Sequence, residues 1–135
     1  MKQAAIFLFY IIALLMQQAG KMDEVPPNRE FSIRVGREVV VKNERVRIAF
    51  SSVVEDSRCP TGEDCIWAGN ARIAIKISVP DNDPVQIELN TDIEPRRASF
   101  SKYDITIVGL SPYPKSNSSI DKRAYTARLI LTPRD

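Results

Sequence analysis

Residues 71–79 read ARIAIKISV, and this stretch has the clearest two-residue alternation in the chain. The alternate positions on one face are Ala71, Ile73, Ile75, Ile77 and Val79, and those on the other are Arg72, Ala74, Lys76 and Ser78. Successive side chains of a strand point to opposite faces of a sheet, so the pattern predicts a strand with one buried face.

Similar alternation recurs on both sides of this stretch. We expect further strands at 31–35, 38–41, 46–50, 85–89, 98–101, 103–107 and 125–132. Segments 38–41 and 46–50 should form a hairpin, and 71–79 should pair with 85–89 across the turn cluster at 80–84. Since no segment after residue 30 has helical spacing, the sequence predicts an all-β fold, an antiparallel β-sandwich or small barrel of about seven strands.

The N-terminal part of the chain has a different character. Lys2 precedes an apolar run from residue 4 to residue 16, so residues 1–20 are predicted to be a signal peptide; an uncleaved anchor is the alternative. Residues 21–30, with two prolines, are expected to be a flexible lead-in. Residues 31–135 are expected to be a single domain, periplasmic or secreted, without a transmembrane span in the mature chain.

The composition narrows the classes of function. The chain has 19 basic and 17 acidic residues, which does not favour nucleic acid as a partner. It has no histidine, which removes Ser–His and Cys–His nucleophiles and most zinc sites. No catalytic residue and no cofactor is therefore predicted.

The segment before residue 71 contains both cysteines and the only tryptophan. Residues 53–71 read VVEDSRCPTGEDCIWAGNA. Two cysteines in an exported chain indicate one disulfide, Cys59–Cys65. A redox pair usually has two intervening residues, whereas this pair has five, so we favour a structural disulfide over a redox or metal role and over free thiols.

Four acidic residues of this segment, Glu55, Asp56, Glu63 and Asp64, are candidate calcium ligands. Their spacing does not match an EF-hand. The simpler interpretation, which we favour, is an acidic loop in which Arg58 pairs with one carboxylate. The turn at 81–83 has the same two interpretations.

Trp67 has two alternative roles. It follows Cys65 by two residues, so both side chains of an extended segment would point the same way. We therefore expect Trp67 to pack inward as a lid over the disulfide, with Gly69 leaving room for the chain to turn into the next strand. The alternative is an exposed aromatic side chain that binds a ligand.

Outward-facing basic residues of the predicted strands are a further candidate surface. They are Arg34, Arg45, Arg47, Arg72, Lys76 and Arg128. Such a face would suit anionic lipid or polysaccharide. We favour instead a solvated face in which Glu38, Glu88 and Asp104 are interspersed with them.

One set of residues resembles a known pattern: Phe50, Val53, Asp56–Pro60 (DSRCP), Cys65–Gly69 (CIWAG), Ala71, Leu110, Pro112 and Tyr125. It is similar to a family of small exported bacterial β-rich proteins that are mostly uncharacterised. The resemblance implies an envelope or secreted β-domain, and it favours Asp56 and Arg58 as a buried pair that pins the loop. The resemblance carries no assignment of an enzymatic activity.

These observations predict an exported, disulfide-stapled β-domain with a binding or structural role in the bacterial envelope. Its partner would be an envelope protein or a glycan. One alternative is an inhibitor that presents the Cys59–Cys65 loop to its target. Another is a carboxylate-dependent hydrolase, although the spacing of the acidic residues does not require an enzyme.

Overall fold

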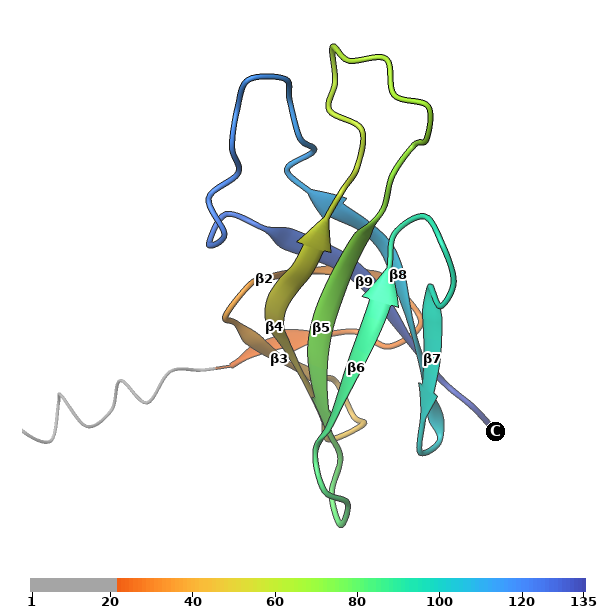
Figure 1. Ribbon diagram of the computed structural model, residues 1–135. Helices are drawn as coiled ribbons and strands as arrows, with labels where there is room; N and C mark the ends of the chain where they lie inside the picture. The colour runs from red at the N-terminus through yellow and green to blue at the C-terminus, as the bar shows by residue number, and fades with distance from the viewer. Residues whose placement is uncertain (1–21) are drawn as a thin grey trace, which may run out of the picture.

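The structure, a computed structural model that describes residues 22–135, contains nine strands in two sheets (Figure 1). The first sheet has the order β1-β3-β4-β5-β6, and the second has the order β2-β9-β8-β7. The strands are β1 Asp23–Val25, β2 Glu30–Arg34, β3 Glu38–Val41, β4 Val46–Asp56, β5 Ala71–Ser78, β6 Val85–Asn90, β7 Arg97–Phe100, β8 Tyr103–Ser111 and β9 Thr126–Pro133. The all-β prediction is confirmed. The predicted signal peptide lies outside the described residues.

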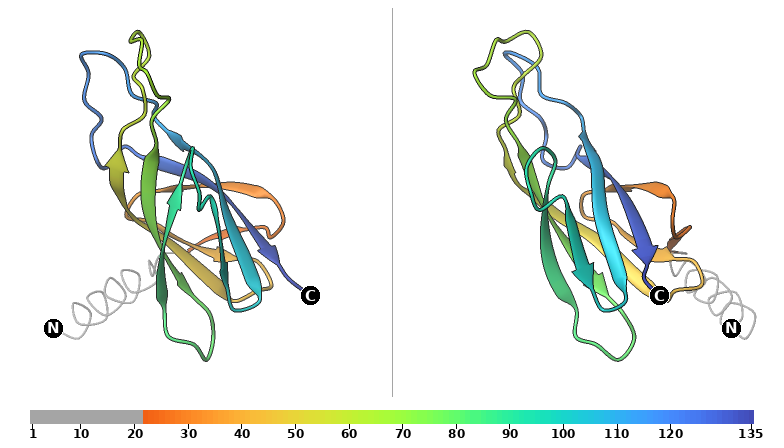
Figure 2. Two further views of the ribbon diagram at one scale, coloured as in Figure 1. Left: turned by 45° about the vertical axis from the view of Figure 1, so that its right-hand side comes forward. Right: turned by 90° about the vertical axis from the view of Figure 1, so that its right-hand side faces the viewer.

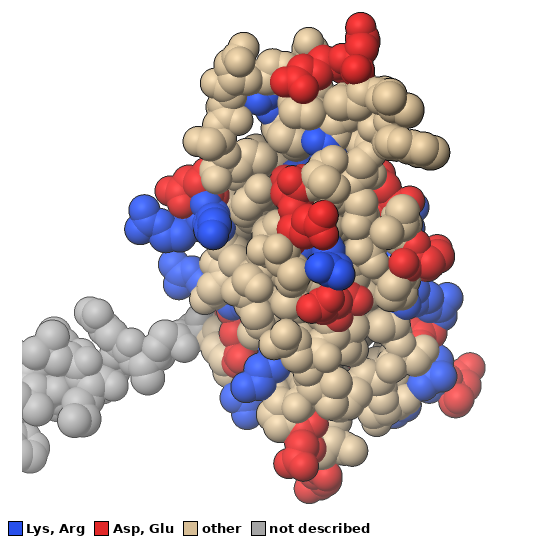
Figure 3. All heavy atoms as spheres, viewed as in Figure 1, with Lys and Arg blue, Asp and Glu red and all other residues tan. Residues whose placement is uncertain are grey.

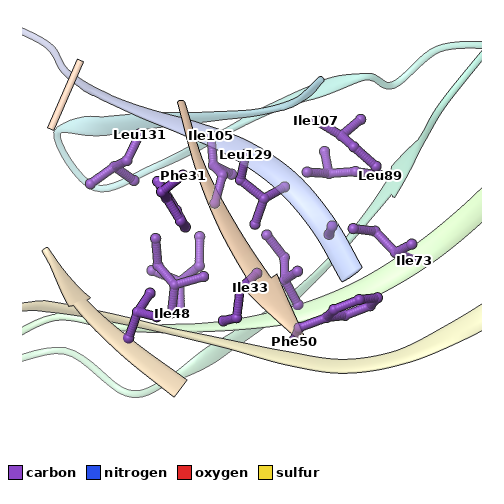
Figure 4. Close-up of a cluster of buried hydrophobic side chains, with 14 of the residues drawn as sticks. Phe31, Ile33, Ile48, Phe50, Ile73, Leu89, Ile105, Ile107, Leu129 and Leu131 are labelled. Atoms are coloured by element: carbon purple, nitrogen blue, oxygen red, sulfur yellow. The ribbon is translucent and has the colours of Figure 1, made fainter. Parts of the chain in front are cut away.

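The alternating apolar residues form the core between the sheets. In β5, Ile73, Ile75 and Ile77 are fully buried, as the pattern of residues 71–79 predicts. From the other sheet, Ile107 of β8 and Leu129 of β9 fill the same space. Figure 4 shows Ile73, Ile107 and Leu129 among the side chains that point into the space between the sheets. The two-residue alternation therefore identified the inward face of the sandwich.

The strand pairing confirms both predicted hairpins. Strands β3 and β4 are antiparallel, and so are β5 and β6. Strand β4 is longer than expected and contains two irregularities, between Phe50 and Ser52 and between Val53 and Glu55. Such bulges bend a strand and increase its twist. The alternation of apolar residues stops at Phe50, which explains why the sequence did not show the full length of β4.

Part of the expected flexible lead-in is instead ordered. Residues 23–25 form β1, which pairs in parallel with β3, and the carbonyl oxygen of Val25 accepts a hydrogen bond from the backbone N–H of Lys42 at 2.8 Å. Val25 also packs against the core. Three residues are too few to show an alternating pattern, but β1 pairs with an edge of β3 that would otherwise be unpaired.

Three loops lie at one end of the sandwich. The cysteine loop, residues 57–70, joins β4 to β5, and the β8–β9 loop covers residues 112–125. Figures 1 and 2 show both loops extending from the same end of the two sheets. The third loop, the β6–β7 loop, covers residues 91–96 and lies at the same end. Its first residue, Thr91, donates its backbone N–H to the carbonyl of Ala71, which directly follows the cysteine loop, at 2.9 Å. This end of the molecule contains the candidate site.

Candidate binding loop

The cysteine loop is closed by the predicted disulfide. Cys59 and Cys65 are bonded, with their Cα atoms 5.9 Å apart. Cys65 is exposed and Cys59 is half-buried, so the disulfide lies in the loop and outside the core. The disulfide therefore constrains the loop itself.

The base of the loop is a narrow neck. The backbone N–H of Ser57 donates to the carbonyl of Asn70 at 2.8 Å, and that of Cys59 donates to the carbonyl of Ala68 at 2.9 Å. Between these bonds, Gly69 has φ +76°, and a Cβ atom there would lie 1.9 Å from the carbonyl oxygen of Ser57. Glycine is therefore required both by its backbone conformation and by the close approach of the opposite arm.

Asp56 and Arg58 form the pair that the resemblance favoured, with Arg58 buried and Asp56 half-buried. Arg58 is only 5% exposed. Its guanidinium donates to both carboxylate oxygens of Asp56, to the carbonyl of Leu110 at 2.7 Å and to that of Pro112 at 2.9 Å. The Tyr125 hydroxyl also donates to Asp56 Oδ2 at 2.9 Å. Since Leu110 belongs to the second sheet, this network joins the sheets beneath the loop.

The surroundings fix the charges of this network. Burial acts to raise the pKa of Asp56, but hydrogen bonds from Arg58 and Tyr125 outweigh burial and hold this pKa below its ordinary value. Burial, with a smaller effect from the hydrogen bond to Asp56, raises the pKa of Tyr125 to about 12. At neutral pH, Asp56 is thus ionised and Tyr125 is a neutral donor. These states suit a structural pair better than proton transfer.

The β8–β9 loop supports the cysteine loop from one side. Thr61 donates its backbone N–H to the carbonyl of Pro114 at 3.0 Å and accepts one from the N–H of Ser116 at 3.2 Å. The Ser116 hydroxyl donates to Glu63 Oε1 at 3.0 Å. In addition, the Tyr113 ring centre lies 4.9 Å from the guanidinium carbon of Arg58. The sequence did not reveal this pairing, because the β8–β9 loop has no alternating pattern.

The predicted position of Trp67 is wrong. Trp67 is 80% exposed, and its neighbour Ile66 is 93% exposed. The error arises because Cys65 is itself exposed, so the disulfide gives no inward direction to its neighbours. Arg58 and Tyr125, in contrast, are both buried.

The structure does not gather the four candidate calcium ligands. Glu55 lies near Arg72, with 3.6 Å between the charged atoms, Asp56 pairs with Arg58, and Glu63 accepts the bond from Ser116. Over residues 22–135, no group of three or more acidic or cysteine side chains is arranged to hold a metal ion. Glu55, Asp56 and Glu63 thus have separate partners.

The basic residues of the strands do not share one face. Arg34 and Arg128 lie on β2 and β9 of the second sheet, whereas Arg47, Arg72 and Lys76 lie on the first. Acidic partners accompany several of them: Glu38 for Arg47, Glu55 and Glu88 for Arg72, and Glu30 for Arg128. Figure 3 shows basic and acidic side chains interspersed on the visible face.

A hollow of about 350 Å³ lies beside Trp67, between the cysteine loop and the β6–β7 loop. Its lining includes Trp67, Gly69, Asn70, Asp92 and Ile93. The Asn70 side-chain oxygen accepts the backbone N–H of Asp92 at 3.1 Å, which ties the two loops together. Sequence reasoning missed Asp92 and Ile93, because residues 92–97 showed only the composition of a charged loop.

The chain matches no protein-family model, no curated protein and no solved structure. Within residues 22–135, no helix has the length and hydropathy needed to cross a membrane. The described chain is an all-β sandwich whose disulfide-closed loop presents two apolar side chains to solvent.

Proposed function

We propose that this protein is an exported binding domain whose cysteine loop docks onto a protein partner. The observation that carries the proposal is the exposure of Ile66 and Trp67 side by side on that loop. Tryptophan is enriched among the residues that contribute most to binding at protein interfaces. An isolated exposed apolar residue is ordinary, but an adjacent isoleucine and tryptophan on a constrained loop suit a contact surface.

The construction of the loop supports this role. The disulfide closes it, the neck bonds at Ser57 and Cys59 join its arms, and the β8–β9 loop holds Thr61. Binding by a preorganised loop loses less conformational entropy than binding by a flexible one. The scaffold thus fixes the loop while leaving Ile66 and Trp67 available.

The compartment is part of the proposal. A disulfide persists in oxidising surroundings, which agrees with the predicted signal peptide and with a periplasmic or secreted location. We also propose that the protein is a member of the exported bacterial family that shares the DSRCP and CIWAG motifs. The partner would then be another envelope or extracellular protein.

An inhibitor is the second candidate, and the projection of the loop favours it. Figure 1 shows the cysteine loop extending beyond the ends of the strands, as a segment that enters a partner's cleft must do. Inhibition would be one form of the same docking. It would be recognised if the captured partner were an enzyme whose activity falls when this protein is added.

Affinity capture from envelope extracts of the native host tests the proposal. The full chain, exported through its own leader, is compared with Ile66→Ser and Trp67→Ala variants. Val85→Ser is the matched control, because Val85 is also exposed but lies on β6, beside the turn at the opposite end. We expect a specific partner to be captured by the wild type and by Val85→Ser, and to be lost with the two loop variants. Equal capture by all four proteins would reject docking through the loop.

A further inference from the structure

The hollow beside Trp67 combines an aromatic surface with a single charged group. Trp67 and Ile93 are 80% and 56% exposed, and both line the hollow. Asp92 is the only charged residue in the lining, and no lysine or arginine contributes to it. The chemistry of the hollow is therefore aromatic, aliphatic and anionic.

The Asp92 carboxylate has no cationic partner among residues 22–135. Its Oδ2 atom accepts a hydrogen bond from the Thr91 hydroxyl, and its backbone is held by Asn70. Asp56, Asp104 and Asp121, in contrast, are each paired with an arginine. Asp92 also borders a second hollow, which Arg58, Arg96 and Arg128 line, but no ion pair joins Asp92 to any of these arginines. The negative charge of Asp92 thus remains available to a ligand.

The charge within the lining of the hollow favours a cation. Indole attracts a positive charge over its face, and a nearby carboxylate adds a direct electrostatic attraction. Glu63 and Asp64 belong to the same loop but do not line the hollow, and Figure 3 shows acidic side chains at this end of the molecule with basic side chains below them. An anionic ligand would meet repulsion from Asp92 without a compensating base in the lining.

We propose that this hollow receives the ammonium or guanidinium group of a lysine or arginine side chain of the protein partner. The inference rests on the proposed docking function and names the partner's chemistry at one position. The cation lies against the Trp67 indole and is paired with the Asp92 carboxylate. Ile66, which is not part of the lining, contacts an apolar surface of the same partner.

The single tryptophan gives the experiment a direct signal, because all tryptophan fluorescence of the chain comes from Trp67. The full-length exported protein is titrated with the peptide acetyl-Gly-Gly-Lys-Gly-Gly-amide, its arginine counterpart and its Nε-acetyl-lysine counterpart. We expect a saturable change with the lysine and arginine peptides, no saturation with the acetylated peptide, and weaker binding at high salt. Asp92→Asn should weaken binding by about tenfold, and Asp81→Asn, at the far turn, should leave it unchanged.

Melting temperatures of the two asparagine variants should equal that of the wild type, since both carboxylates are exposed. Equal responses to the lysine and acetyl-lysine peptides, or no effect of Asp92→Asn, would overturn the cation site. Saturation by methyl glucoside in place of the basic peptides would assign the hollow to a sugar. If partner capture depends on Trp67 but not on Asp92, the docking proposal stands and the cation site is rejected. If the basic peptides bind but no partner is captured, the cation site stands and the docking proposal is rejected.

Discussion

The guanidinium of Arg58 faces the carboxylate of Asp56 through two hydrogen bonds, Nε to Oδ1 at 2.8 Å and Nη2 to Oδ2 at 2.7 Å. Both residues come from the β4 end of the cysteine loop, yet the same guanidinium also reaches Leu110 and Pro112. The pair therefore serves as a clasp between the two sheets. Arginine suits this position because its planar group has five donors.

Arg58→Met should be strongly destabilising, since it leaves the Asp56 carboxylate partly buried without its cation and removes two bonds to backbone carbonyls. Losing one member of a buried pair typically costs ~3–5 kcal/mol of unfolding free energy. The control is Arg47→Met, whose side chain is 57% exposed and 3.9 Å from Glu38, and which should cost less than ~1 kcal/mol. Urea denaturation measures both; equal losses would contradict the clasp.

Gly69→Ala should destabilise the protein more than Gly36→Ala. Both glycines have φ +76°, so both variants incur the left-handed backbone cost of about 1–2 kcal/mol. At Gly36 nothing lies within 4 Å of the added Cβ, whereas at Gly69 the Ser57 carbonyl oxygen would lie 1.9 Å away. The difference in unfolding free energy therefore isolates the steric contribution of the neck. Similar losses in the two variants would show that the arms can separate freely.

Trp67→Ala should leave the stability nearly unchanged, because the indole is 80% exposed. The matched control is Phe50→Ala in the core, where the side chain is fully buried and its loss should cost ~3–5 kcal/mol. The fluorescence of the wild type should resemble that of indole in water. A blue-shifted emission, together with a large loss of stability in Trp67→Ala, would restore the packed lid.

The stability of the fold should fall in alkaline solution. Burial, together with the hydrogen bond to Asp56, raises the pKa of Tyr125 from 10.0 to about 12, and Tyr103, bonded to Glu44, has a similar value. A raised pKa in the folded state gives stability that is complete below pH ~10 and is lost as the pH rises toward ~12. Urea titrations across this range should show the fall, and Tyr125→Phe should reduce it. If the unfolding free energy of Tyr125→Phe fell with pH as steeply as that of the wild type, Tyr125 would not contribute to the loss of stability.

The sequence predicted the parts of the structure that depend on local alternation. Ile73, Ile75 and Ile77 share a face because strand geometry requires it, and the core follows from such positions. Trp67 was misplaced because strand geometry was extended past Cys65 into a loop that has no regular structure.

The contacts that build the candidate site are long-range. Arg58 and Leu110 are 52 positions apart, and no local pattern indicates that they meet. Asp92 and Ile93 reach the hollow beside Trp67 because β5 and β6 are paired, which brings the β6–β7 loop next to the neck. Their composition alone could not identify a site, since charged residues are common in surface loops.

The backbone hydrogen bonds from Thr61 to Pro114 and Ser116 hold the cysteine loop and the β8–β9 loop together. We therefore expect the two loops to change together in evolution and to require transfer together in engineering. An insertion in one loop would displace Thr61 from its partners unless the other loop changed length as well. Homologues should therefore vary the lengths of both loops together. Likewise, a graft that moves the cysteine loop to another sandwich should keep its shape only if residues 112–118 are transplanted with it.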